Sequence, residues 1–246
     1  MTRRFDGDDL PGAVFDKTDL TGARFVEADL SGARLRGVVL DGAVIDGSIE
    51  GLVVNGIDVE ALIEAELDRR HPERLLLRSA DPDELREAWR LLEATWSATT
   101  AEALARPEAD LRLQVDGEWS FLETLRHLAF ASDSWIGAGV LGRLSFDPIE
   151  IAGWWFDSAA AGLDVDADPS LDEVLQVRSS RQALVRDWLA GVTAAELEQT
   201  TRPDPSVLWP PQQPRTALSR LHVVLNEEWW HHRFARRDMA QWPSSA

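Results

Sequence analysis

The chain has 246 residues, a formal net charge of −18 and no cysteine. The charge argues against broad nucleic-acid binding through phosphate contacts. The lack of cysteine excludes disulfides, thiolate metal ligands and a cysteine nucleophile. No apolar run reaches the roughly 18 residues of a membrane span, and the N-terminus lacks the apolar segment of a secretory signal. We therefore expect a cytoplasmic, globular protein with no membrane and no nucleic-acid partner.

The first fifty or so residues carry a repeat with a period of five. A bulky apolar residue recurs in the series Phe5, Leu10, Phe15, Leu20, Phe25, Leu30, Leu35, Leu40 and Ile45. In most units a small residue stands two positions before it. This period fits neither a helix nor a flat strand, but it fits a coil that turns a corner in every unit, with both side chains pointing inside. Units such as DLTGARF and DLSGARL resemble pentapeptide repeats, which implies a short right-handed quadrilateral β-helix.

The repeat ends at Glu50, where an apolar residue was due. A solenoid of about two coils exposes both ends and needs capping, so we expect it to lean on the rest of the chain. Pentapeptide repeats can imitate DNA, but residues 1–54 carry a net charge of only −4. DNA mimicry is therefore the weaker interpretation of this segment.

The period of the apolar residues changes after the repeats. Asn55 and Gly56 predict a turn, which is followed by a helix from about residue 58 to residue 70. A second helix is expected to start near Asp81, with this residue as the N-cap and Pro82 in the first turn.

A third helix begins at the capping box of Ser120 and Glu123 and is expected to continue to about residue 140. A long irregular connection follows, and connections of this length are often functional. Two further helices are expected over about residues 171–189 and 216–240, without any strand pattern. The sequence thus predicts a mixed fold, with repeats at 1–54, a connecting helix and linker at 55–80, and an all-α four-helix bundle at 81–246.

The last helix contains LNEEWWHHRF, in which Glu227 lies over His231 and Glu228 over His232, because residues four apart share a helix face. Its apolar stripe consists of Leu218, Leu221, Leu225, Glu228, His232, Ala235 and Met239. Glu228 and His232 belong to this stripe, whereas Glu227 and His231 lie on its flank. A carboxylate in an apolar stripe is costly unless it is paired or binds a metal. Glu228 and His232 are therefore the better metal-ligand candidates.

A third ligand must come from elsewhere, and the remaining histidines are His71, His127 and His222. His71 stands in a charged helix end, and His222 lies about 15 Å from His232 along the same helix. This leaves His127, although a lone histidine on an apolar helix is more often a core residue. His127, Glu228 and His232 would form a site for a divalent metal.

The segments WSFLETLRHLAFASDSW and NEEWWHHRFARRD resemble the DinB superfamily of metal-binding four-helix bundles, in its DinB_2-type branch. The resemblance implies one ligand from the second bundle helix and two, four residues apart, from the last. Many members use three histidines, and this chain departs from them with Glu228. The mycothiol-dependent maleylpyruvate isomerases of the superfamily have a similar His, Glu, His arrangement.

The resemblance implies a metal-dependent transferase or isomerase that acts on a small molecule with a thiol such as mycothiol or bacillithiol. Zinc is the expected metal, with nickel and iron as alternatives, and the thiol must be external because the chain has no cysteine. Trp154, Trp155 and Arg233 are candidate substrate contacts, and the catalytic residues stay unassigned. A homodimer is compatible with the sequence. The alternative is a non-catalytic binding module that has kept the bundle and lost its chemistry.

Overall fold

The computed structural model describes residues 5, 10–26, 28–153 and 156–243. The chain divides into two compact units, residues 1–35 and 36–246. This division falls inside the repeats, so the boundary between residues 54 and 55 stays a prediction. Within the described ranges, no helix is both long and apolar enough to cross a membrane.

The repeats form a regular series of turns. The backbone N–H of Ala13 donates to the carbonyl of Leu10, and Ala23, Ala33 and Ala43 repeat this bond at distances of 2.9 to 3.1 Å. Each turn holds a glycine with φ between 72° and 74° at its third position, as a type II turn requires. Every second unit therefore supplies a hydrogen-bonded corner.

The bulky side chains of the repeats are exposed, which corrects the expectation that they point inside. Their exposed fractions run from 44% at Leu20 to 65% at Ile45, and none of the described residues between 10 and 48 belongs to a strand. A solenoid coil buries its side chains against the coils above and below it. With about two coils, most side chains lack such a neighbour. The described part of the repeats therefore shows the turns expected of a β-helix but not its strands.

A hairpin and two helices follow the repeats. Strands β1 (Val53–Val54) and β2 (Ile57–Asp58) pair in antiparallel fashion across Asn55 and Gly56, both of which have positive φ. This is the predicted turn, and its backbone is the form that suits a two-residue hairpin. Helix α1 (Glu60–Arg70) and helix α2 (Arg74–Leu77) then lead to the bundle.

Four long helices form the bundle, and their starts follow the predicted caps. The Asp81 side chain accepts the N–H groups of Asp83 and Glu84 at the start of α3, and Ser120 and Glu123 form a capping box at the start of α5. The four helices are α3 (Pro82–Leu104), α5 (Phe121–Ser132), α6 (Leu171–Gly191) and α8 (Ala217–Met239).

Shorter elements connect these helices. A π-helical turn, Asp133–Ala138, extends α5 close to its predicted end. The others are α4 (Glu108–Leu111), α7 (Ala194–Leu197), β3 (Thr200–Thr201) and β4 (Arg215–Thr216). The expectation of no strand after the repeats is wrong for these short pairs, since β3 pairs with β4 ahead of α8. Two-residue strands are too short for a sequence period to be visible.

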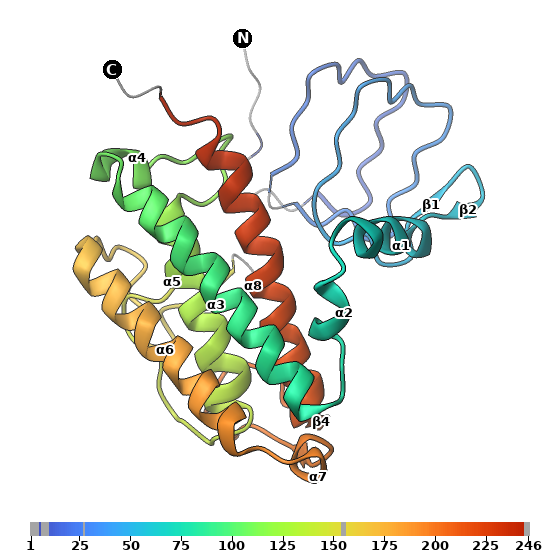
Figure 1. The fold of residues 1–246 in the computed structure, drawn as a ribbon. Coiled ribbons are helices and arrows are strands. Elements are labelled where there is room, and N and C mark those ends of the chain that lie inside the picture. Colours follow the sequence, from blue (N-terminus) through green and yellow to red (C-terminus); the bar gives the residue numbers. More distant parts are fainter. Residues whose placement is uncertain (1–4, 6–9, 27, 154–155, 244–246) are drawn as a thin grey trace. The chain divides into compact units, whose positions relative to one another are not determined.

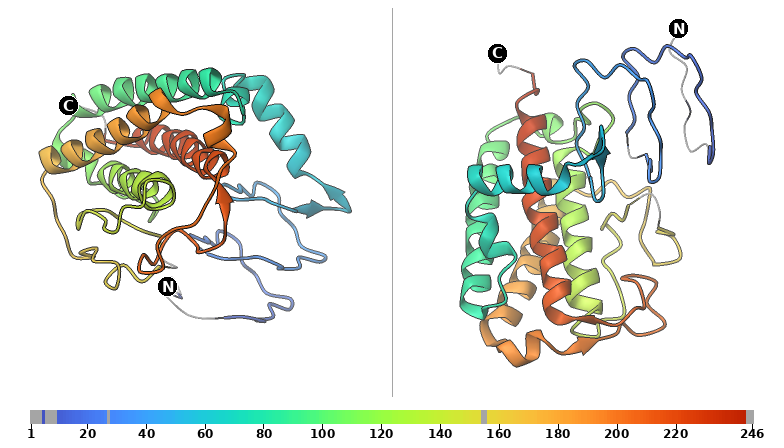
Figure 2. Two further views of the ribbon diagram at one scale, coloured as in Figure 1. Left: turned by 90° about the horizontal axis from the view of Figure 1, so that it is seen from below. Right: turned by 90° about the vertical axis from the view of Figure 1, so that its right-hand side faces the viewer.

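The long helices pack around two main clusters of buried apolar side chains. Helix α5 contacts α6 and α8, and α3 contacts the same two helices, so that the four lie side by side (Figures 1 and 2). Trp89 and Trp96 of α3 are buried, as are Leu221 and Leu225 of α8. The interior of this bundle is where the inward faces of α5 and α8 meet.

Candidate metal centre

Helix α5 contributes His127, which is 6% exposed. Its Nδ1 lies 3.0 Å from the backbone carbonyl oxygen of Ile151. A carbonyl oxygen only accepts hydrogen bonds, so Nδ1 carries the proton and donates. The other ring nitrogen, Nε2, is not used in this bond and lies near Glu227 of α8.

Helix α8 places Glu227 and His231 beside this nitrogen. Glu227 Oε2 lies 3.5 Å from His127 Nε2 and 3.0 Å from His231 Nε2. One ligand atom from each of the three side chains lies within 4.8 Å of the others. The spacing of four residues between Glu227 and His231 puts both on the helix face that meets α5.

The charges of the group favour a bound cation. Burial by itself would raise the pKa of Glu227, but hydrogen bonds and charge interactions with His127 and His231 outweigh it and lower the pKa. Burial lowers the pKa of His231. A carboxylate thus lies 3.5 Å from Nε2 of His127. Imidazole nitrogen and carboxylate oxygen are ligands that a divalent metal such as zinc accepts, so the residues present fit a metal.

Aromatic rings surround the three ligands. The Trp119 ring lies 4.4 Å from the ring of His127 and 5.8 Å from that of His231, measured between centroids. Phe130 and Phe234 approach the two histidine rings to 6.3 and 5.8 Å. The Glu227 side chain remains 33% exposed, so the group is covered by apolar rings but is not sealed from solvent.

The structure does not bring the predicted set of His127, Glu228 and His232 together. Glu228 is 1% exposed, as its place in the stripe indicates, but both its carboxylate oxygens accept hydrogen bonds from Arg178 of α6, at 2.7 and 2.5 Å. His232 Nε2 lies 2.8 Å from Thr99 Oγ1 of α3. The group of three potential ligands that the structure does bring together is His127, Glu227 and His231.

The geometry of a helix explains why the observed group differs from the predicted one. Adjacent residues point about 100° apart, so neighbouring pairs on α8 face different helices of the bundle. The 227 and 231 pair faces α5, whereas the next pair faces α6 and α3. A buried carboxylate needs a partner, and for Glu228 the partner is an arginine rather than a metal.

Of the other candidate residues, Arg233 has its contacts with residues outside this group. Arg233 donates to His71 Nε2 at 2.9 Å, and its guanidinium carbon lies 4.8 Å from the Trp229 ring. Trp154 and Trp155 lie outside the described residues. Their connection nevertheless contributes to the group through the Ile151 carbonyl.

The model of the DinB superfamily, in its DinB_2 form, matches residues 84–235. The chain belongs to the DinB superfamily. Residues 5–48 match eight copies of the pentapeptide repeat, ahead of the DinB domain. No curated protein and no solved structure matches the chain. The DinB superfamily is metal-binding, and the group of His127, Glu227 and His231 lies inside the matched DinB range.

Sequence reasoning missed two further components of this DinB-type group. Trp119 directly precedes the capping box of α5, and this position close to the start of the His127 helix was its only signal in the sequence. The Ile151 carbonyl had no signal, because a backbone oxygen in an irregular connection leaves no residue pattern.

Proposed function

We propose that this chain is a divalent-metal-dependent enzyme, a transferase or isomerase that uses a low-molecular-weight thiol such as mycothiol or bacillithiol. The observation that supports it best is the convergence of three potential ligand atoms within 4.8 Å, on residues of a metal-binding superfamily. Three protein ligands leave one position of a four-coordinate metal open, which is the catalytic arrangement.

Zinc is the proposed metal, with nickel and iron as alternatives. When bound, it would supply a Lewis acid that lowers the pKa of a thiol and so favours the nucleophilic thiolate. The chain has no cysteine, and the thiol must therefore be a co-substrate. We further infer a small-molecule substrate and no nucleic-acid partner, in keeping with the net charge of −18.

The chain's own residues orient the site and cover part of it. The Ile151 carbonyl fixes the ring and the tautomer of His127, as partners of metal-bound histidines do. Trp119 covers both histidine rings. The exposed part of Glu227 marks the side from which a thiol and a substrate would enter.

The metal content of variants tests the ligand set. His127→Ala, Glu227→Ala and His231→Ala should each remove most of the metal from protein purified without a histidine tag, as measured by elemental analysis. His232→Ala is the matched control, because it changes the next residue and leaves the three ligands in place. Loss of metal in His232→Ala with retention in His231→Ala would overturn the assignment.

A cobalt-substituted protein tests the use of a thiol. Mycothiol or bacillithiol added to it should produce a thiolate-to-cobalt charge-transfer band. Since the chain has no cysteine, such a band has no other source, and His231→Ala should not show it. A metal-loaded protein that gives no band with either thiol would instead support a non-catalytic binding module.

A further inference from the structure

A second cavity lies between α2, α3 and α8, on the side of α8 that carries His232. Its volume is about 560 Å³, which is within the range of small-molecule sites. Its apolar lining includes Leu77, Leu91, Leu92 and Trp229, and His71 and Arg233 lie at the same cavity. None of the three proposed metal ligands lines it.

Arg233 brings a positive charge to this cavity, and among the described residues no carboxylate pairs with it. Its guanidinium donates to Nε2 of His71 and packs against Trp229. The neighbouring arginines differ, since Arg236 pairs with Glu102 and Arg237 pairs with Asp238. Glu73 also lines the cavity, but its carboxylate lies 3.4 Å from His71 Nδ1.

We propose that this cavity binds a small aromatic carboxylate, whose carboxylate pairs with Arg233 and whose ring lies against the leucines of the lining. A guanidinium holds a carboxylate through two parallel hydrogen bonds, and an arginine beside apolar walls gains more from such a pair than one in water. The site is independent of the metal group and extends beyond the proposed reaction.

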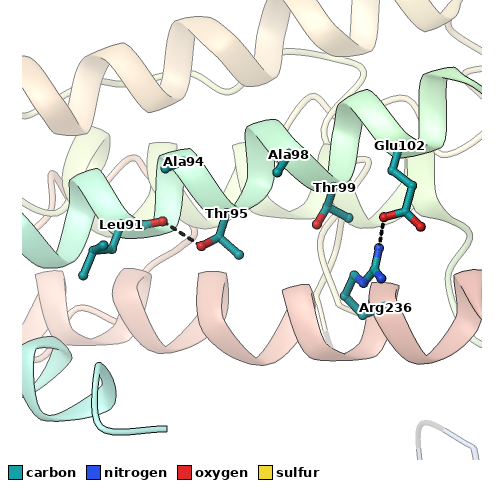
Figure 3. Close-up of a pocket in the computed structure, with 7 residues that line it drawn as sticks. All are labelled: Leu91, Ala94, Thr95, Ala98, Thr99, Glu102 and Arg236. Carbon is teal, nitrogen blue, oxygen red and sulfur yellow. Dashed lines mark hydrogen bonds and ion pairs between the residues drawn. The ribbon is translucent and has the colours of Figure 1, made fainter.

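The adjoining groove gives the ring room to extend. This groove shares Leu91, Thr95 and Arg236 with the cavity. Figure 3 shows Arg236 of α8 reaching across to Glu102 of α3, with Thr99 beside them and Thr95 farther along the same helix, next to Leu91. Because Arg236 is already paired, the anion is held at Arg233 and the apolar part of the ligand points toward Leu91 and Thr95.

Calorimetric titration of the full chain with 1-naphthoate tests the proposal. The wild type should bind 1-naphthoate at least tenfold more tightly than the uncharged 1-naphthylmethanol. Arg233→Gln should weaken naphthoate binding at least tenfold, whereas Arg90→Gln, which removes an exposed arginine of α3 paired with Glu87, should leave it unchanged. Absence of naphthoate binding, or equal binding by Arg233→Gln, would overturn the proposal.

Two further variants separate the cavity from the fold and from the metal. Thr95→Trp places a large side chain at an exposed position of the cavity lining and should abolish naphthoate binding without changing the unfolding temperature. His231→Ala should lose metal and still bind naphthoate with the wild-type affinity. If His231→Ala lost both the metal and naphthoate binding, the two sites would not be independent and the proposal would fail.

Discussion

Glu228 and Arg178 form an ion pair with side-chain exposures of 1% and 5%. Arg178 also lies over the ring of Trp96, with its guanidinium carbon 5.7 Å from the ring centroid. Burial raises the pKa of Glu228, and Arg178 opposes that rise. The pair therefore links α6 to α8 through two charges that are almost completely shielded from water.

We expect Glu228→Ala to destabilise the bundle by about 3–5 kcal/mol, because it leaves Arg178 buried and unpaired. Urea unfolding measures this loss. The double variant Glu228→Met with Arg178→Leu should recover most of the stability, since an apolar pair has no charge to bury. Metal content of the folded single variant should be unchanged, and a variant that lost its metal would contradict the structural role.

Glu150 is the second residue for which burial decides the charge. Burial, followed by the nearby Asp133 carboxylate, raises its pKa to about 10, against the attraction of Arg181. The folded state therefore keeps a proton that the unfolded chain loses near pH 4.5. Stability from this group is full at acidic pH and is lost as the pH rises toward 10.

Comparison with Glu150→Gln isolates this effect. The unfolding free energy of the wild type should fall relative to that of the variant as the pH rises from 5 to 9, by of order 1 kcal/mol per pH unit. Chemical denaturation at several pH values measures the difference. A difference independent of pH would mean that Glu150 is ionised in the folded protein.

At the scale of elements, the repeats and the bundle helices hold their shape by different means. The long helices have capped ends and buried faces. The repeats have hydrogen-bonded turns, but their bulky side chains remain about half exposed. Turns alone do not offset the entropy that an ordered backbone loses.

A fragment of residues 1–54 should therefore be unfolded. Circular dichroism and proton NMR should show no cooperative melting and no dispersed signals, because the fragment buries too little apolar surface. The fragment 55–246 is the matched comparison and should melt cooperatively. A soluble 1–54 fragment with a sharp thermal transition would contradict this view of the repeats.

For the whole molecule, metal binding should raise the free energy of unfolding of the bundle. A ligand that binds only the folded state, at a hundred times its Kd, stabilises it by about 2.7 kcal/mol. Chelation should therefore lower the unfolding temperature by several degrees, as followed by fluorescence, because all eleven tryptophans lie at or beyond residue 89. His231→Ala should unfold at the same temperature with and without chelator, and a shift in that variant would point to a different metal site.

The order of helices could be predicted from the sequence because caps and apolar periods are local. Asp81 and Ser120 mark helix starts by the hydrogen bonds that their own side chains make. The choice between Glu227 and Glu228 as the metal-ligand candidate could not be predicted in this way. Each is followed by a histidine four residues later, and only the packing of α5 and α6 against α8 distinguishes the two. Arg178 makes the difference, because it pairs with Glu228. The apolar stripe of α8 gives no information about a partner 50 residues away in the sequence.

The hydrogen bond between His127 and the Ile151 carbonyl ties the long connection before α6 to the metal group. Arg126 holds the same stretch through the carbonyl of Ile149, at 2.6 Å. A cation that immobilises the His127 ring therefore also immobilises the carbonyl bonded to it, and more free energy is needed to lift the connection from α5. Proteases cleave a segment only when it leaves the surface that it packs on. The rate of cleavage within residues 157–168 thus reports the occupancy of the metal group without any assay of activity.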